Sequence, residues 1–216
     1  IGFAESHVKC STLAFFTPIL PVTAVNYFHG GDKVLIASQG GVNFWIGNNP
    51  RSDGSTAIVP GTRGGWWPGY FDSIALAEQE AERKLRPSEV SQFYARKAWA
   101  FLLGDPTHSI PLLLRKLWIF WIDYELGNNE DVRFVAHHFS WIPRWMPVRF
   151  AFLGPLGLLG FVLVLFGRER ARAFPLWSFL LLYTASVVAF FVCSRFRAPI
   201  LPVLIVFASQ AVFWIV

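Results

Sequence analysis

The chain has 216 residues, of which 54% are hydrophobic, 17% aromatic and only 15% charged, and its formal net charge is +5. Soluble domains usually carry about a quarter charged residues, so this composition favours a membrane protein and excludes an intrinsically disordered chain. Two cysteines exclude a disulfide scaffold. Positive charge in so apolar a chain is no indication of nucleic-acid binding. Because the chain begins at Ile1 and ends within an apolar run, we expect it to be a fragment of a longer protein.

The first apolar run, residues 12–25, is predicted to be a transmembrane helix or the end of one, within a membrane segment that covers residues 1–25. Pro18 and Pro21 interrupt this run. A signal peptide is the alternative interpretation, but the two prolines break the apolar region that such a peptide needs.

Residues 26–149 hold most of the charges and are predicted to form an outer domain. The apolar stretches 33–38 and 42–46, separated by two glycines, predict a short strand pair. Asparagine, glycine and proline at residues 47–50 predict a turn after the second strand.

The remainder of the outer domain is predicted to be mostly helical. The aromatic stretch 63–70 is expected to be an irregular loop, and residues 73–85 are rich in helix-forming residues. Pro87 opens a second helix, with Ser88 as its N-cap, and this helix runs to Leu103.

A third helix is predicted for residues 106–125, with Asp105 as the N-cap and Pro106 at the first helical position. This helix is too apolar for a solvated surface. We therefore expect it to lie in the membrane interface, where Arg115 and Lys116 extend to the lipid headgroups.

Three charge-free or charge-poor runs close the sequence, and each has about the 18–20 residues that cross a hydrocarbon core of roughly 30 Å as a helix. They are residues 150–167, 173–194 and 198–216. Three arginines crowd the connection at residues 167–172, which the positive-inside rule places in the cytoplasm. The outer domain and the connection at residues 194–197 then face the periplasm or the exterior.

The predicted fold is thus mainly α: a multi-pass protein of the inner (plasma) membrane with about four transmembrane helices. Its expected domains are the membrane segment 1–25, the mixed but mostly helical outer domain 26–149 with its strand pair, and the three transmembrane helices of 150–216.

The first candidate site is Arg195 and Arg197, two residues apart between the last two predicted spans. Arginine binds phosphate oxygens with two parallel hydrogen bonds, and lipid phosphates lie at this depth of a membrane. The two side chains are therefore candidates for binding the phosphate of a lipid carrier. The alternative is that they anchor the helix ends to ordinary phospholipid headgroups.

The second candidate site is the stretch 40–50, with Asn43, Trp45, Asn48 and Asn49. Amides bind sugar hydroxyls and aromatic rings cover the apolar faces of sugars, so these residues are candidates for substrate binding. The alternative is a well-ordered turn, because asparagine and glycine are also common turn residues.

The third candidate site is Tyr124 with Glu125, at the end of the predicted interfacial helix. Asp123 and Glu125 are two residues apart and do not share a helix face, so they are not an acid–base pair. Glu125 either helps to position a substrate or caps the helix end. No residue pattern predicts a metal site, and a divalent metal remains an open alternative for the cofactor.

Several stretches together resemble the outer segment of bacterial family 39 membrane glycosyltransferases, relatives of the protein mannosyltransferases and of the lipid A aminoarabinose transferase in the GT-C superfamily. These stretches are Asn26-Tyr27, Gly30-Gly31-Asp32, residues 37–50 (ASQGGVNFWIGNNP), Asp53-Gly54, Tyr124-Glu125, Asn128-Asn129 and Arg195–Pro199. The resemblance covers about residues 12–216. It implies a multi-pass inner-membrane enzyme that moves a sugar from a polyprenyl-phosphate carrier to an acceptor on the outer side.

The chain departs from the family pattern in two respects. The catalytic acidic residue of the family belongs to a first outer loop that precedes this chain, so we expect no catalytic residue here and an inactive fragment. Phe196 replaces the tyrosine of the usual Arg-Tyr-Arg-x-Pro pattern. The resemblance therefore implies a polyprenyl-phosphate-linked sugar and membrane lipids as partners, and leaves the sugar and the acceptor open.

Two other functions remain as alternatives. One is a non-catalytic, membrane-anchored module that binds glycans or a partner. The other is a transporter of lipid-linked sugars, which should show more polar residues in mid-span than the few present here. These are Thr184, Ser186, Ser209 and Gln210.

Overall fold

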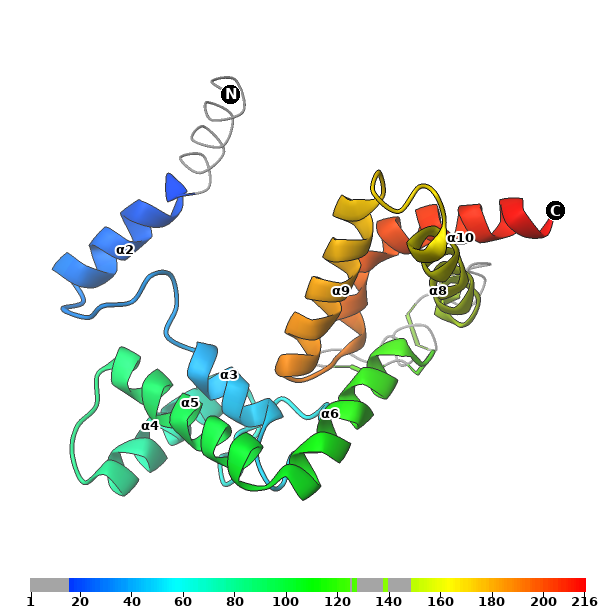
Figure 1. Ribbon diagram of the computed structural model, residues 1–216. Helices are drawn as coiled ribbons and strands as arrows, with labels where there is room; N and C mark the ends of the chain where they lie inside the picture. The colour runs from blue at the N-terminus through cyan, green and yellow to red at the C-terminus, as the bar shows by residue number, and fades with distance from the viewer. Residues whose placement is uncertain (1–15, 125, 128–137, 140–148) are drawn as a thin grey trace. The chain divides into compact units, whose positions relative to one another are not determined.

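The computed structural model of the chain describes residues 16–124, 126–127, 138–139 and 149–216. Over these residues the fold is entirely helical, with eight α-helices, one 3-10 helix and no strand (Figure 1). The prediction of a mainly α protein is confirmed, and the prediction of a strand pair is wrong.

The described α-helices have between 8 and 18 residues. In chain order they are α2 (Ile19–Phe28), α3 (Gly40–Gly47), α4 (Trp66–Ala81), α5 (Pro87–Gly104), α6 (Pro106–Trp121), α8 (Phe150–Phe166), α9 (Phe174–Ala189), the 3-10 helix η2 (Ser194–Ile200) and α10 (Leu201–Ile215).

The chain divides into two compact units. Unit 1 contains the residues up to Trp45 together with Ile58–Ala100, and unit 2 contains Ile46–Ala57 and Phe101–Val216. The division therefore falls within α3 and within α5. The expected domain boundaries at residues 25 and 149 follow hydropathy and stay a prediction, whereas these units follow packing.

The stretch predicted as a second strand is helix α3, and residues 33–38 form no regular element. Short apolar runs read alike as strand or helix, and packing decides between them. Gly41 lies against α5 so closely that a Cβ atom there would be 1.7 Å from the carbonyl oxygen of Ser91. The Gly41 amide donates to the Ser91 hydroxyl at 2.9 Å. The glycine that resembled a break between strands is thus a contact residue of a helix.

In unit 1, a buried tyrosine links α5 to α4. Ala77 of α4 and Ala98 of α5 are also fully buried. The Tyr94 hydroxyl donates to the carbonyl oxygen of Ser73 at 2.8 Å, and burial raises the pKa of this phenol to about 12. A phenol held between two helices keeps its proton and its hydrogen bond throughout the ordinary pH range.

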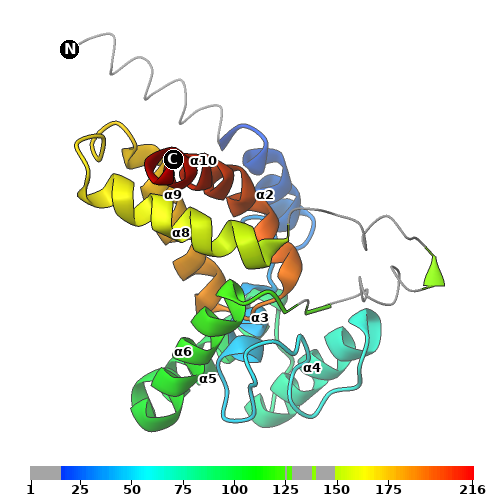
Figure 2. The same ribbon diagram turned by 90° about the vertical axis from the view of Figure 1, so that its right-hand side faces the viewer.

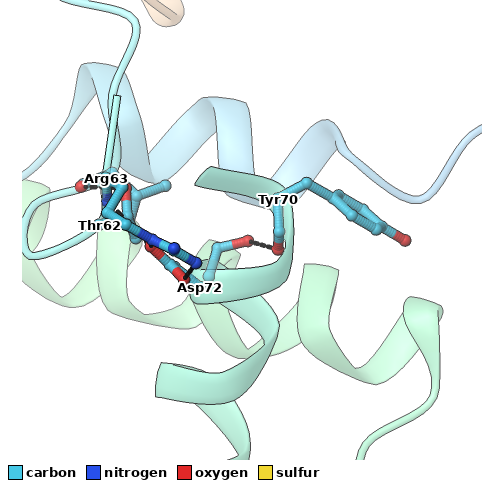
Figure 3. A network of polar contacts seen from close by, with 6 residues as sticks. Thr62, Arg63, Tyr70 and Asp72 are labelled. Carbon is cyan, nitrogen blue, oxygen red and sulfur yellow. Dashed lines mark hydrogen bonds and ion pairs between the residues drawn. The ribbon is translucent and has the colours of Figure 1, made fainter. Parts of the chain in front are cut away.

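Helix α4 begins at Trp66, inside the stretch predicted to be an irregular loop. Pro68 is tolerated there because the first turn of a helix has no intrahelical use for its amide. Arg63 precedes the helix and binds Asp72: its guanidinium donates at 2.7 and 2.9 Å and its backbone amide at 3.0 Å (Figure 3). This double contact fixes the loop onto the helix that follows.

The first turn of α5 is capped from outside its own sequence. Ser88, the predicted N-cap, donates its backbone amide to the Asp32 carboxylate at 2.7 Å, and its hydroxyl also donates to Asp32. A carboxylate at a helix N-terminus satisfies an unpaired amide and complements the helix dipole. The capping group is therefore Asp32, and the prediction for Ser88 is wrong. Asp105, by contrast, accepts from the backbone amide of His108 and caps α6 as predicted.

In unit 2, α6 packs on α9 and α8 packs along α10; Figure 2 shows α8 and α10 side by side. Their buried core includes Phe120, Leu180, Leu204 and Phe207. Gly160 of α8 approaches α10 so closely that a Cβ atom would lie 1.7 Å from the carbonyl oxygen of Phe207. Close helix contact through small residues is typical of helices that associate in lipid.

One helical stretch of the described residues is long and apolar enough to cross a membrane, Ser194–Ile215 with 22 residues. Helices also form in the other predicted runs, but α2, α8 and α9 are shorter, at 10, 17 and 16 residues. An α-helix rises about 1.5 Å per residue, so these three fall short of a hydrocarbon core of roughly 30 Å.

Candidate functional site

The ends of α6 and α9 carry the polar contacts that connect the predicted motifs of unit 2. The last carbonyl oxygens of any helix lack an intrahelical partner, and they carry the negative end of the helix dipole. In this unit two buried cations, Lys116 and Arg197, satisfy these oxygens. We call them the capping cations.

Lys116 of α6 caps the end of α9. Its side chain is fully buried, and its Nζ atom donates to the carbonyl oxygens of Phe190 at 2.7 Å and Val188 at 3.2 Å and to Asn48 Oδ1 at 2.8 Å. Burial lowers the pKa of Lys116 to about 8. The expectation that Lys116 extends to lipid headgroups is wrong, because its place on the helix faces the interior; Arg115 beside it is exposed.

Asn48 completes this cap and joins it to the end of α3. Its Nδ2 atom donates to the carbonyl oxygen of Ala189 at 2.7 Å, while its Oδ1 atom accepts from Lys116. Gly47 makes the approach possible, since a Cβ atom there would lie 2.0 Å from the Phe190 carbonyl oxygen. Asn49 is also buried and binds the local main chain: it donates to Ile46 O at 3.0 Å and accepts from the Arg51 amide at 2.8 Å.

Arg197 caps the end of α6 in return. Its Nε atom donates to Phe120 O at 3.0 Å, and its Nη2 atom donates to Ile119 O and Tyr124 O, each at 3.1 Å. The guanidinium carbon also lies 4.8 Å from the centre of the Phe150 ring. Arg197 is only 3% exposed. The end of α9 is therefore capped by Lys116 of α6, and the end of α6 is capped by Arg197 of η2, the 3-10 helix that follows α9.

Arg195 lies on the surface, two residues before a buried arginine. Its guanidinium carbon is 5.3 Å from the centre of the Phe196 ring, a stacking that orients the side chain. Just before it, Ser194 and Leu126 exchange two hydrogen bonds, at 2.6 and 3.1 Å. The Arg195 segment therefore lies directly beside the end of the chain segment that carries Tyr124.

The remaining predicted residues divide between the units. Tyr124 belongs to unit 2, and its side chain is 51% exposed. Asn43 and Trp45 belong to unit 1 and are half-buried, with the Lys97 ammonium 5.3 Å from the centre of the Trp45 ring. The prediction for Glu125 lies outside the described residues.

Sequence reasoning missed the role of Lys116, although a signal was present. The buried residues of α6 recur at intervals of three and four, which is the spacing of one helix face. They are Ser109, Leu112, Lys116, Ile119 and Phe120. A lysine in step with an apolar stripe points to a buried cation, and its partners then have to come from elsewhere in the chain.

The polar groups of this site are one exposed guanidinium, that of Arg195, and buried cations and amides that bind other groups of the protein. The nearby Asp123 accepts from the Ala151 amide at 3.1 Å. Among the residues that the structure describes, no group of three or more His, Cys, Asp or Glu side chains could hold a metal ion.

No protein-family model, no curated protein and no solved structure matches this chain. The family resemblance stays a prediction that rests on the residues quoted above.

Proposed function

We propose that this chain is part of a membrane glycosyltransferase that moves a sugar from a polyprenyl-phosphate carrier to an acceptor on the outer face of the inner membrane. The observation that carries the proposal is that Tyr124 and Arg197, which belong to two stretches of the resemblance and lie 73 residues apart in sequence, meet in unit 2. Asn48 and Gly54, of two further stretches, contact the segment just before Arg195. Asn48 contacts the end of α9, the Val192 amide donates to Gly54 O at 2.8 Å, and Arg197 contacts the carbonyl oxygen of Tyr124.

The surface of the C-terminal helices supports a place in the membrane. The buried positions of α8 are glycines, at residues 154, 157 and 160, whereas large apolar side chains point outward. Strongly exposed examples are Phe152, Phe166, Leu182, Ile205 and Phe213. Small residues at helix contacts and large apolar residues outside are typical of helices that face lipid. We propose the four-span arrangement, with residues 26–149 on the periplasmic or exterior side, on this basis.

We assign different roles to the two arginines. Arg195, exposed and oriented by Phe196, contacts the phosphate of the carrier and stabilises the negative charge that develops as the sugar leaves. Arg197 is a positioning residue, which holds the 194–197 turn on the end of α6. Asn48 and Asn49 act in the same supporting way, and the exposed side chain of Tyr124 is a substrate contact.

The test is transfer of a labelled sugar from a polyprenyl-phosphate carrier by the protein that contains this chain, measured in membranes. Arg195→Gln should lower the rate about 30- to 1000-fold, since a lost charge-assisted contact to a phosphate in a low-dielectric site costs about 2–4 kcal/mol. Arg195→Lys should restore the rate only in part, because it keeps the charge and loses the forked geometry.

Arg115→Gln is the matched control, because it removes an equally exposed arginine from the same unit and should leave the rate unchanged. A full rate for Arg195→Gln would contradict the assignment of Arg195. Binding of the carrier without transfer would favour the non-catalytic module, and movement of the carrier across the membrane without transfer would favour the transporter.

A further inference from the structure

Unit 1 contains an open cavity of about 1000 Å³, which involves none of the residues assigned above to sugar transfer. Its walls are the end of α2, the loop that follows it, and the connection between α4 and α5. This volume is at the upper end of what small-molecule sites in proteins offer.

The walls of the cavity are fixed by hydrogen bonds. Thr23 of α2 donates to Leu35 O at 2.7 Å and Asn26 donates to Val34 O at 3.0 Å, which ties the loop to the helix. Asp32 is buried, and it accepts from the amides of Lys33 at 2.8 Å and Ser88 at 2.7 Å. The loop is therefore held against the first turn of α5 before any ligand arrives.

Positive charge exceeds negative charge in this cavity. Lys33, Arg83, Lys84 and Arg86 line it, together with the carboxylates of Asp32 and Glu89. Arg83 pairs with Glu89 at 2.8 Å, and Lys84 pairs with Glu78 at 2.7 Å. Within the described part of the chain, Lys33 and Arg86 form no ion pair, and the only lining carboxylate outside the Arg83–Glu89 pair is Asp32, which binds the amides of Lys33 and Ser88.

Arg86 is nonetheless held in place. Its Nη1 atom donates to the Gly31 carbonyl oxygen at 3.1 Å, which leaves most of its five N–H groups for a ligand. Arg96 extends the cationic surface, since it lines a smaller cavity of about 360 Å³ that shares Arg83 and Gln92 with the larger one.

Aromatic and apolar side chains complete the cavity. Tyr27 and Phe28, at the end of α2, are 52% and 78% exposed and meet edge to face at 5.2 Å. Leu85 lines the opposite wall. Rings and apolar side chains beside an excess of cations suit a molecule that has an anionic group on a carbon skeleton.

We propose that this cavity binds a phosphate-bearing ligand, with Lys33 and Arg86 on the phosphate oxygens and Tyr27 and Phe28 along the carbon skeleton. A phosphomonoester carries about −1.5 to −2 charges at neutral pH, so its oxygens can accept hydrogen bonds from both Lys33 and Arg86. A lipid headgroup and a soluble sugar phosphate share this chemistry. The test separates the two sources, and because it measures binding it stands or fails independently of sugar transfer.

The experiment titrates the whole chain, held in uncharged detergent micelles, with two probes: glucose 1-phosphate in solution and dioleoyl phosphatidic acid mixed into the micelles. Calorimetry and native mass spectrometry give the affinity and the number of bound molecules. We expect one equivalent to bind. The double variant Lys33→Gln/Arg86→Gln should lose about 100-fold in affinity, since each charge-assisted contact is worth about tenfold.

The matched control is Arg51→Gln/Arg115→Gln, which removes the same charge from two exposed arginines of unit 2. Its affinity should stay within about threefold of the native chain, because screening weakens distant charges. Lys33→Gln alone keeps the backbone contact of Lys33 with Asp32 and should cost about tenfold in affinity. Arg86→Lys should retain part of the affinity, and circular dichroism should show native helicity in every variant.

Binding of both probes, or of one, with loss in the double variant supports the proposal and identifies the source of the phosphate. Phosphatidic acid alone assigns a lipid headgroup, and glucose 1-phosphate alone assigns a soluble ligand. Binding of neither probe overturns the proposal. Equal weakening by the control variant also overturns it, since the attraction would then come from net charge and not from this cavity.

Discussion

The ion pairs at the surface of unit 1 and the buried cations of unit 2 have different partners. In unit 1 the cations meet carboxylates at the surface, as in the pairs Arg63–Asp72, Arg83–Glu89, Lys84–Glu78 and Lys97–Glu80. In unit 2 the capping cations, Lys116 and Arg197, are buried and meet main-chain carbonyl oxygens. In these examples, exposed cations pair with carboxylates, whereas buried cations bind the carbonyl oxygens at helix ends.

This difference has an energetic consequence. Exposed ion pairs contribute little, because water and salt screen them and both side chains lose freedom. A buried cation that is removed leaves several carbonyl oxygens without a partner, and each unpaired buried polar group is costly. We therefore expect the same kind of substitution to have unequal effects in the two units.

The largest effect is expected for Lys116→Ala, which should lower the free energy of unfolding by about 3–5 kcal/mol or prevent folding. The change removes the donor to Val188 O, Phe190 O and Asn48 Oδ1. Chemical unfolding in micelles, followed by circular dichroism, measures it. Arg115→Ala is the control on the same helix. Equal losses of unfolding free energy in the two variants would show that the burial of Lys116 does not matter.

Arg197→Gln should come next, with a loss of about 2–4 kcal/mol, since three carbonyl oxygens at the end of α6 lose a charged donor. Arg195→Gln, two residues away and exposed, should change stability by less than about 0.5 kcal/mol. The same unfolding measurement compares them. Similar stabilities for the two variants would mean that burial does not separate the two arginines.

Stability should also depend on alkaline pH through Lys116. Its folded pKa is lowered to about 8 from the ordinary value of 10.5, so the unfolded chain binds the proton more tightly. The free energy of unfolding should therefore rise by up to about 3 kcal/mol as the pH increases from about 8 to about 10.5. Other groups titrate in the same range. The Lys116→Met variant isolates the contribution, because a slope that persists there comes from another group.

The smallest effect is expected at the surface of unit 1. The Arg63 guanidinium lowers the pKa of Asp72 to about 2 from 3.8, so this pair stabilises the fold above about pH 4 and its contribution is lost as the pH falls towards 2. Asp72→Asn should lower the melting temperature only slightly at pH 7, and salt should reduce even that difference. If Asp72→Asn lowered the free energy of unfolding as much as Lys116→Ala, exposed ion pairs would matter as much as buried cations, and the comparison would be wrong.

The sequence was sufficient for the parts of the fold that depend on local signals. Long apolar runs became helices, and Asp105 with Pro106 marked the start of α6. Where the decision depended on packing, the prediction was wrong: α3 is a helix because it packs on α5 at Gly41, and Ser88 is capped by a carboxylate 56 residues earlier in the chain. Short apolar segments carry no local signal strong enough to decide such cases.

The candidate site shows the same limit. Asparagine, glycine and arginine marked segments that make long-range contacts in unit 2, such as that of Arg197 with the Tyr124 carbonyl oxygen. The roles within them depended on burial, which separates Arg195 from Arg197 although the two residues are chemically identical. Lys116 could be assigned to a buried helix face from its spacing, but its acceptors lie 68 to 74 residues away in the chain.

The contacts of the capping cations also determine when each helix end is completed during translation. The carbonyl oxygen of Phe120 has no Arg197 side chain to accept from until the ribosome has added 77 more residues. At about 5–20 residues per second, the end of α6 is therefore incomplete for roughly 4–15 s after it is made. Lys116 likewise waits for Phe190. In a nascent chain that ends before Val188, Lys116 has only Asn48 of its three acceptors, so the contact between α6 and α9 becomes complete only late in synthesis.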